Sequence, residues 1–280
     1  MRQDDSPPTV VVGIDGSRAA VTAALWAVDE AVSRDIPLRL VYAIDPADAK
    51  PGEEEAHRFT TAELAVRHAY MAVESLQRTL KIEVAIMQGR AVEVLRRASR
   101  SAAMVCVGAL GLHHFADGHV GSTAVALAAT AHCPVALIRD PGCRRAGESD
   151  WVVAEIDEST DSNAVLQLGV DQALLRGTAL RVVTAGPAGR VATADEGKLA
   201  AARLDRTLDR WRHRYPQLDV AAEVAHGSYL DYLTQHREQI GLVVVGSHNR
   251  AGIAQLTEPN GVAALKDSGS SVLIGNNRRL

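Results

Sequence analysis

The sequence predicts an α/β protein made of two tandem doubly wound, Rossmann-like units, each with a five-stranded, mostly parallel sheet. Three observations lead to this fold class. The chain has 280 residues, which suits two domains of about 140 residues each. Short β-branched runs alternate with longer helical stretches, and the second half of the chain repeats the first. This alternation is typical of parallel sheets with helices on both faces.

The first half contains five apolar, largely β-branched runs of the kind that form buried parallel strands. They are Val10–Ile14, Leu38–Ala43, Ile82–Met87, Met104–Val107 and Val135–Ile138. Four helices are expected between them: Ala19–Ser33, Ala62–Leu80, Val92–Ser101 and Ser122–Ala131. Ser17 precedes the first helix and can cap it by accepting a hydrogen bond from an unpaired backbone N–H. Right-handed connections then leave a doubly wound sheet as the obvious topology.

Two segments do not fit this alternation. The stretch Asp45–Thr60 is rich in Pro, Glu, Asp and Ala, and we expect a polar excursion before the second helix. Pro141, Gly142 and Gly147 mark an interdomain linker. The expected domains are therefore residues 1–140 and 150–280, joined by a linker at 141–149.

The internal repeat is visible at a nearly constant offset. The segment 11–17 aligns with 153–159, which is 142 positions later, and Arg39 aligns with Arg181 at the same offset. Further along, the segment 104–108 aligns with 242–246 at an offset of 138. An ordered series of such matches indicates a tandem duplication that lost four residues from its second copy.

Ligands of doubly wound sheets bind outside the carboxyl ends of the strands, where the strand order reverses. Two loops of the first half meet there: residues 13–16, and a long glycine loop that runs from Gly108 to Ser122. Glycines allow close backbone approach, and a helix N-terminus attracts phosphate. The glycine loop has no Walker lysine, and no G-x-G-x-x-G follows the first strand, which disfavours a dinucleotide dehydrogenase.

The spacing Gly-x2-Gly-x9-Gly-Ser in this loop, together with Asp15 after the first strand, resembles the ATP-binding signature of the universal stress protein family. The resemblance covers both halves and therefore matches the tandem-domain form of that family. It implies that Asp15 and the Val41 backbone hold the adenine, with Gly13 allowing close approach near the nucleoside. It also implies that the phosphates of ATP are cradled by Gly108, Gly111, Gly121, Ser122 and Thr123. Mg²⁺ bridging the phosphates is an expectation of nucleotide chemistry.

Each of these assignments has a structural alternative. Asp15 could merely cap the first helix, and the glycines could be turn residues only. The glycine loop also contains His113, His114 and His119. Because these histidines lack a helical i, i+4 scaffold, a solvated loop fits them better than a metal site.

The second copy has lost most of this signature. Asp157 is kept, but Glu155 and Glu158 replace two glycines of the first copy, Asn249 replaces the second loop glycine, and 259–262 lacks Gly-Ser. Each added carboxylate would repel a phosphate by roughly 1 kcal/mol at ~4 Å even in water. We expect the second site to bind ATP weakly or not at all.

Composition excludes several classes of function. The formal net charge is −4 without a basic cluster, which argues against a nucleic-acid partner. No apolar run approaches the ~20 residues of a membrane span, and Met1–Pro8 has no apolar stretch typical of a signal peptide. Three cysteines cannot all pair, which favours free thiols and a cytoplasmic location.

No catalytic constellation is evident, because the sequence has no nucleophile elbow, no metal-ligand cluster and no base placed against the glycine loop. We therefore expect an ATP-binding regulatory or stress-response protein with little or no catalysis. The alternatives are a slow ATP hydrolase of the same fold, a sensor of AMP or a cyclic nucleotide, and a scaffold with vestigial loops. The expected partners are an adenine nucleotide and either a second copy in a homodimer or a regulatory protein.

Overall fold

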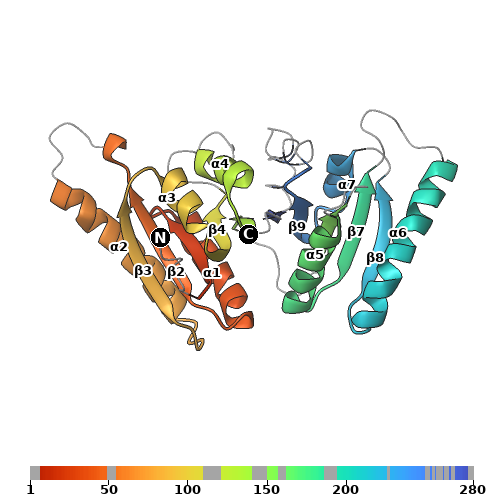
Figure 1. Ribbon diagram of the computed structural model, residues 1–280, viewed down its shortest axis with the longest axis horizontal. Helices are drawn as coiled ribbons and strands as arrows, with labels where there is room; N and C mark the ends of the chain where they lie inside the picture. Colours follow the sequence, from red (N-terminus) through yellow and green to blue (C-terminus); the bar gives the residue numbers. More distant parts are fainter. Residues whose placement is uncertain are drawn as a thin grey trace, which may run out of the picture. The chain divides into compact units, whose positions relative to one another are not determined.

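The computed structural model describes residues 7–48, 55–109, 121–140, 150–156, 162–185, 194–225, 228–249, 253, 256, 261, 265 and 269–276. The chain divides into two compact units, residues 1–140 with 278–280 and residues 141–277. Each unit is an α/β structure in which strands and helices alternate along the chain (Figure 1). The fold class is the one that the sequence predicts.

The first unit contains a five-stranded sheet. Its strands are β1 (Thr9–Ile14), β2 (Leu38–Ile44), β3 (Ile82–Gln88), β4 (Ala102–Gly108) and β5 (Val135–Ile138). The strand order is β3-β2-β1-β4-β5, and neighbouring strands pair in parallel. The sequence order reverses between β1 and β4, because β2 and β3 lie on one side of β1 while β4 and β5 lie on the other. This is the switch point at which doubly wound sheets bind ligands.

Four helices cover the two faces of this sheet: α1 (Arg18–Ser33), α2 (Glu55–Glu74), α3 (Ala91–Ala98) and α4 (Ser122–Thr130). A short 3₁₀ turn at Pro46–Asp48 follows β2. Helix α1 packs against α2, and α3 packs against α4, so each pair forms one layer. Alanines dominate the buried side of α1, because small side chains let a helix lie close to a parallel sheet. The capping role predicted for Ser17 is confirmed, since its Oγ accepts a hydrogen bond from the Ala20 N–H at 3.1 Å.

The second helix differs from the sequence expectation at both ends. It begins at Glu55, inside the predicted polar excursion, and ends at Glu74 rather than Leu80. Its first turns carry mostly exposed side chains, so apolar periodicity could not reveal them. The helix stops because Gln77 adopts a positive φ of 51° and its N–H donates to the Glu74 carbonyl in a closing turn.

The second unit has the strand order β10-β9-β6-β7-β8. Its strands are β6 (Trp151–Glu155), β7 (Leu180–Ala185), β8 (Val220–Ala225), β9 (Ile240–Gly246) and β10 (Ser271–Gly275). Its helices include α5 (Ser162–Arg176), α6 (Ala194–Arg214) and α7 (Tyr229–Gln235). Neighbouring strands of this sheet pair in parallel.

The pairing register of the first unit recurs in the second at the offsets that relate the two halves of the sequence. Val10 pairs with Leu38, and Val152 pairs with Leu180, 142 positions later. Val10 also pairs with Met104, and Val152 with Leu242, which stands 138 positions after Met104. The register also shifts at equivalent points, between Thr9 and Val10 in β1 and between Trp151 and Val152 in β6. The two sheets therefore share not only a strand order but also a residue-level alignment.

The core of each unit consists mainly of aliphatic strand residues under small helix residues. Cys106 and Cys133 are buried thiols, and burial raises the pKa of Cys133 to about 12. Cys143 lies outside the described residues. Among the helices of the described part, none combines the length and apolar character that crossing a membrane requires.

Candidate functional site

A cavity of about 420 Å³ lies at the carboxyl edge of the first sheet. The ends of β1, β2 and β4 form its floor, and the first turns of α3 and α4 line its sides. Its lining comes from residues 13–20, 41–45, 90–95, 107–108 and 121–124. This volume is within the range of about 300–1,000 Å³ that is usual for small-molecule sites.

The cavity brings together seven of the eight residues that the sequence proposed for nucleotide binding. They are Gly13, Asp15, Val41, Gly108, Gly121, Ser122 and Thr123. The eighth, Gly111, lies outside the described residues, as do His113, His114 and His119. Residues that are more than a hundred positions apart in the chain therefore share one concave surface.

The two ends of the glycine loop are held together by main-chain hydrogen bonds. Gly121 N–H donates to the Ala109 carbonyl at 3.0 Å, and Ala109 N–H donates to the Ile138 carbonyl at 2.8 Å. The first bond within α4 joins Val125 N–H to the Gly121 carbonyl at 3.1 Å. The N–H groups of Ser122 to Ala124 precede that bond and have no acceptor within the helix. With the helix dipole behind them, these amides form a surface that favours an anion.

Gly108 has a structural role that the sequence analysis did not foresee. A Cβ atom at this position would lie 2.8 Å from both the carbonyl carbon and the Cβ of Ala19. Because this contact involves backbone, the clash could not be relieved by rotating a side chain. Gly108 therefore lets α1 lie directly on the end of β4, in addition to lining the cavity.

Asp15 both shapes its own turn and lines the cavity. Its Oδ1 accepts a hydrogen bond from the Ser17 N–H at 2.9 Å, across Gly16, which has a positive φ of 85°. The carboxylate is partly buried. Ser17 and not Asp15 is therefore the N-cap of α1, and Asp15 closes the turn before the helix. This bond leaves further acceptor positions of the carboxylate for a ligand, because a carboxylate has two oxygens.

Val41 lines the cavity as a residue of β2. Val41 lies in the middle of β2, paired on both sides, so its N–H and C=O belong to the sheet ladder. In a parallel ladder, successive residues of a central strand direct these groups to alternate neighbours. Ile44 faces β3, since its carbonyl accepts from Gly89 N–H at 2.9 Å. Ala43 therefore faces the other way, where β1 has ended at Ile14. Ala43, which also lines the cavity, thus lies where the ladder with β1 ends.

Arg90 is a cavity residue that sequence reasoning missed. Gly89, with a positive φ of 129°, turns the chain from β3 into α3, and Arg90 is the N-cap residue of that helix. Arg90 lines the cavity, and its side chain is exposed. The only signal in the sequence was the match of Gly89 with Gly227 in the repeat, which marks a tight turn at the carboxyl edge but does not identify the arginine beside it.

The equivalent place in the second unit is occupied by larger side chains. Glu155 stands where the first unit has Gly13, and Tyr229 stands where it has Ala91. Both are buried, with exposed fractions of 8% and 2%. Burial, reinforced by the negative charge of Glu155, raises the pKa of Tyr229 well above its usual value. Asp157 lies outside the described residues.

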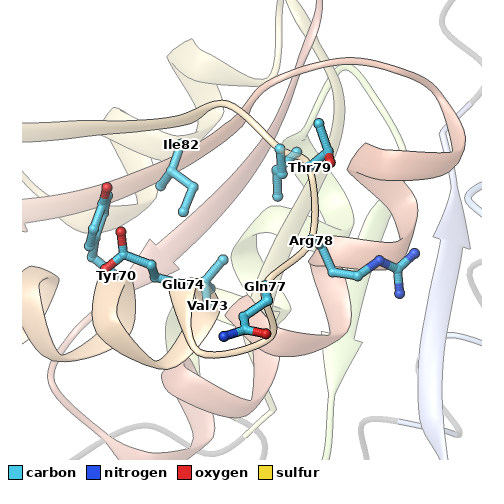
Figure 2. Close-up of a pocket in the computed structure, with 8 residues that line it drawn as sticks. Tyr70, Val73, Glu74, Gln77, Arg78, Thr79 and Ile82 are labelled. Carbon is cyan, nitrogen blue, oxygen red and sulfur yellow. The ribbon is translucent and has the colours of Figure 1, made fainter.

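A second hollow of the first unit, also about 420 Å³, disfavours anions, unlike the cavity at the carboxyl edge (Figure 2). It lies where α2 ends and the chain turns into β3, and its lining includes Tyr70, Glu74 and Arg78. A helix C-terminus and a carboxylate repel anions, and Arg78 already pairs with Asp29 at 3.2 Å. This hollow is therefore a poor phosphate site.

In the part of the chain that the structure describes, no cluster of three or more His, Cys, Asp or Glu side chains could hold a metal ion.

Fold and cavity together define a doubly wound α/β protein with a cavity at the carboxyl edge of its first sheet. The universal stress protein family model matches residues 8–139. A universal stress protein of Mycobacterium tuberculosis strain H37Rv is 46% identical over 278 residues, covering 98% of each chain, and another from this strain is 36% identical, also covering 98% of each. The chain belongs to the universal stress protein family.

A solved structure extends the likeness of fold across both units. The universal stress protein of Archaeoglobus fulgidus superposes with a TM-score of 0.73, covers 95% of each chain and is 14% identical. At this identity the agreement concerns the fold alone.

Proposed function

We propose that the first unit binds ATP in the cavity at the carboxyl edge of its sheet. The observation that carries this proposal is the convergence of Asp15, the ends of the glycine loop and the N-termini of α3 and α4 on one concave surface. An adenine nucleotide combines a flat hydrogen-bonding base with an anionic tail. The cavity offers a carboxylate and strand-end backbone groups for the base, and unpaired helix amides for the tail.

In the proposed complex the base lies beside Asp15 and the end of β2. Asp15 accepts a hydrogen bond from the nucleoside, and the Ala43 carbonyl is the backbone acceptor. The phosphates lie against Gly121, Ser122 and Thr123, where amide and hydroxyl donors are adjacent. Gly13 keeps the floor beside Leu95 and Val107 free of a side chain. Mg²⁺ would be held mainly by the phosphates and water, as is usual for this ion.

We infer further that the chain is a tandem duplication with domains at 1–140 and 150–280 and a linker at 141–149. The recurrence of the pairing register at offsets of 142 and 138 supports this interpretation. The second domain binds nucleotide weakly or not at all, because Glu155 and Tyr229 are buried at the positions equivalent to Gly13 and Ala91.

The proposed role is regulatory, with ATP binding that changes conformation or partner choice rather than driving chemistry. A ligand shifts a protein between two states only if it binds one of them better. A regulatory protein or a second copy of this chain is the expected partner, and a cytoplasmic location stays a prediction. A slow ATP hydrolase, a sensor of AMP or a cyclic nucleotide, and a scaffold are the alternative functions.

Two measurements test the proposal. Denaturing the freshly purified protein and identifying any released compound by mass spectrometry should give an adenine nucleotide. Calorimetric titration of the nucleotide-free protein with ATP, AMP, cyclic AMP and adenosine should then give one site per chain with ATP preferred. Two equivalent sites would contradict the assignment to the first unit, and preference for AMP or cyclic AMP would favour the sensor. Phosphate release during the same incubation measures any hydrolysis.

A further inference from the structure

Arg90 is the one basic side chain among the described residues that line the cavity. Two carboxylates, those of Asp15 and Asp45, line the same cavity. Both are already involved in local turns, accepting from Ser17 N–H and Ala47 N–H at 2.9 Å each. An anionic ligand entering this cavity meets two negative groups, and Arg90 is the side chain that can offset them.

The guanidinium of Arg90 is not used by the fold. Within the described part of the chain, Arg90 forms no side-chain hydrogen bond or ion pair, and its side chain is exposed. Other arginines of this unit do have such partners: Arg39 pairs with Glu83 at 2.7 Å and Arg18 with Asp140 at 2.9 Å. Structural stabilisation by a salt bridge therefore does not account for the arginine at position 90.

The position of Arg90 is unfavourable for the helix that it begins. N-cap residues are preferably Ser, Thr, Asp or Asn, whose side chains accept hydrogen bonds from unpaired amides, whereas a guanidinium can only donate. Arg90 accordingly makes no side-chain cap hydrogen bond to α3. The equivalent residue of the second unit, Ser228, forms a complete capping box with Asp231. The N-cap preference is broken by Arg90 in the first unit and followed by Ser228 in the second, which points to a functional constraint on Arg90.

Because Arg90 does not cap α3, the first-turn amides of that helix stay available at the cavity. Ala91 and Val92 line the cavity, and the first bond within α3 joins Val94 N–H to the Arg90 carbonyl at 3.0 Å. The N-terminus of α4 lines the same cavity. Two helix dipoles and one guanidinium thus act on a single space, and all three favour negative charge.

We propose that Arg90 binds a phosphate group of the nucleotide and makes the cavity select ligands by their phosphate charge. This inference rests on the proposed function, because it assigns a selectivity residue within that site. A charge-assisted contact of this kind strengthens with each added phosphate charge, whereas contacts to the base and ribose do not change. Arg90 therefore distinguishes ATP from AMP and adenosine, which share the same base.

The test compares Arg90→Gln, Arg90→Lys and Arg97→Gln in the full-length chain by calorimetric titration with ATP, AMP and adenosine. Arg97 is the matched control, because it is an exposed arginine on the same helix that does not line the cavity. We expect Arg90→Gln to weaken ATP binding by about tenfold to a hundredfold, AMP by less, and adenosine not at all. Arg90→Lys should be intermediate, because it keeps the charge without the two-pronged geometry, and Arg97→Gln should match the parent.

Two results would overturn this inference while leaving the proposed function intact. Equal weakening of ATP and adenosine by Arg90→Gln would place the guanidinium on the nucleoside, and unchanged ATP binding would place it outside the site. If the parent protein binds none of the three compounds, the proposed function fails, and the role of Arg90 fails with it. Far-ultraviolet circular dichroism of each variant confirms that the fold is retained.

Discussion

The carboxyl edges of the two sheets carry different side chains on one backbone plan. Both units have the same strand order and the same register. In the first, Gly13 and Ala91 leave room, and Arg90 leaves the helix amides uncapped. In the second, Glu155 and Tyr229 are buried at the same positions, and Ser228 and Asp231 cap the helix. Helices and sheets are thus preserved by main-chain pairing and core burial, while the site depends on a few side chains at one edge.

The largest expected effect concerns the close helix contact at the end of β4. Gly108→Val would place Cβ 2.8 Å from the Ala19 backbone, whereas Gly246→Val would meet only the Val165 side chain, at 3.1 Å. We expect Gly108→Val to lower the free energy of unfolding by about 3 kcal/mol and Gly246→Val by about 1 kcal/mol. Urea unfolding followed by circular dichroism measures both values. An equal loss of unfolding free energy in the two variants would mean that the helix lies equally close to Gly108 and to Gly246.

The next largest effect is expected on ATP affinity when Gly13 is replaced by glutamate, the residue at the equivalent position of the second unit. Gly13→Glu puts a carboxylate on the cavity floor, where the new Cβ would lie 2.9 Å from the Leu95 side chain and 3.1 Å from the Val107 side chain. Repulsion between this carboxylate and a phosphate is about 1 kcal/mol at 4 Å in water and about 4 kcal/mol near a protein surface. ATP binding should therefore fall by about tenfold or more by calorimetry. Glu155→Gln is the matched control and should leave ATP affinity unchanged; a loss there would show that the second unit takes part in binding.

A smaller effect is expected from Arg90→Ser, which should raise the stability of the protein and lower its affinity for ATP. Arg90→Ser gives α3 the N-cap residue of α7, and with Glu93 at the third helical position a capping box can form. We expect the free energy of unfolding to rise by about 0.5–1 kcal/mol while ATP affinity falls. Thermal melting and titration of the same preparation measure the two changes. A variant that gains stability and keeps its affinity would show that Arg90 is neither a cap nor a ligand.

The smallest effect is a pH dependence of the stability that Asp231 contributes to the second unit. Hydrogen bonds from Ser228 lower the pKa of Asp231 below its usual value of 3.8. A carboxyl whose pKa is depressed by folding stabilises the protein above its unfolded pKa, and this contribution is lost as the pH falls through the folded value. Asp231→Asn should therefore be slightly less stable than the parent near neutral pH, and the difference should vanish in acid. A difference that is independent of pH would assign the effect to packing rather than to the carboxylate.

Much of this architecture could be predicted from residue patterns. The strands of the first unit lie within one or two residues of the expected runs, because buried parallel strands need continuous β-branched residues. Helix α2 was misplaced at its start because its first turns face solvent and carry no apolar period, and at its end because Gln77 adopts a positive φ. The position of Ala43 where the ladder with β1 ends could not be predicted, because strand lengths decide where a ladder ends, and those lengths depend on pairing.

The sequence by itself determined the fold class and the offsets of the repeat, and it predicted a phosphate-binding glycine loop whose signature is lost in the second copy. These features depend on local composition and spacing, which a linear chain displays directly. Only the tertiary structure decided that Arg90 and the α3 amides belong to the same cavity, that Gly108 is required by the α1 backbone, and that Tyr229 is buried beside the charge of Glu155. Such relations join residues distant in the chain, and they arise because parallel strands bring their carboxyl ends to a common edge.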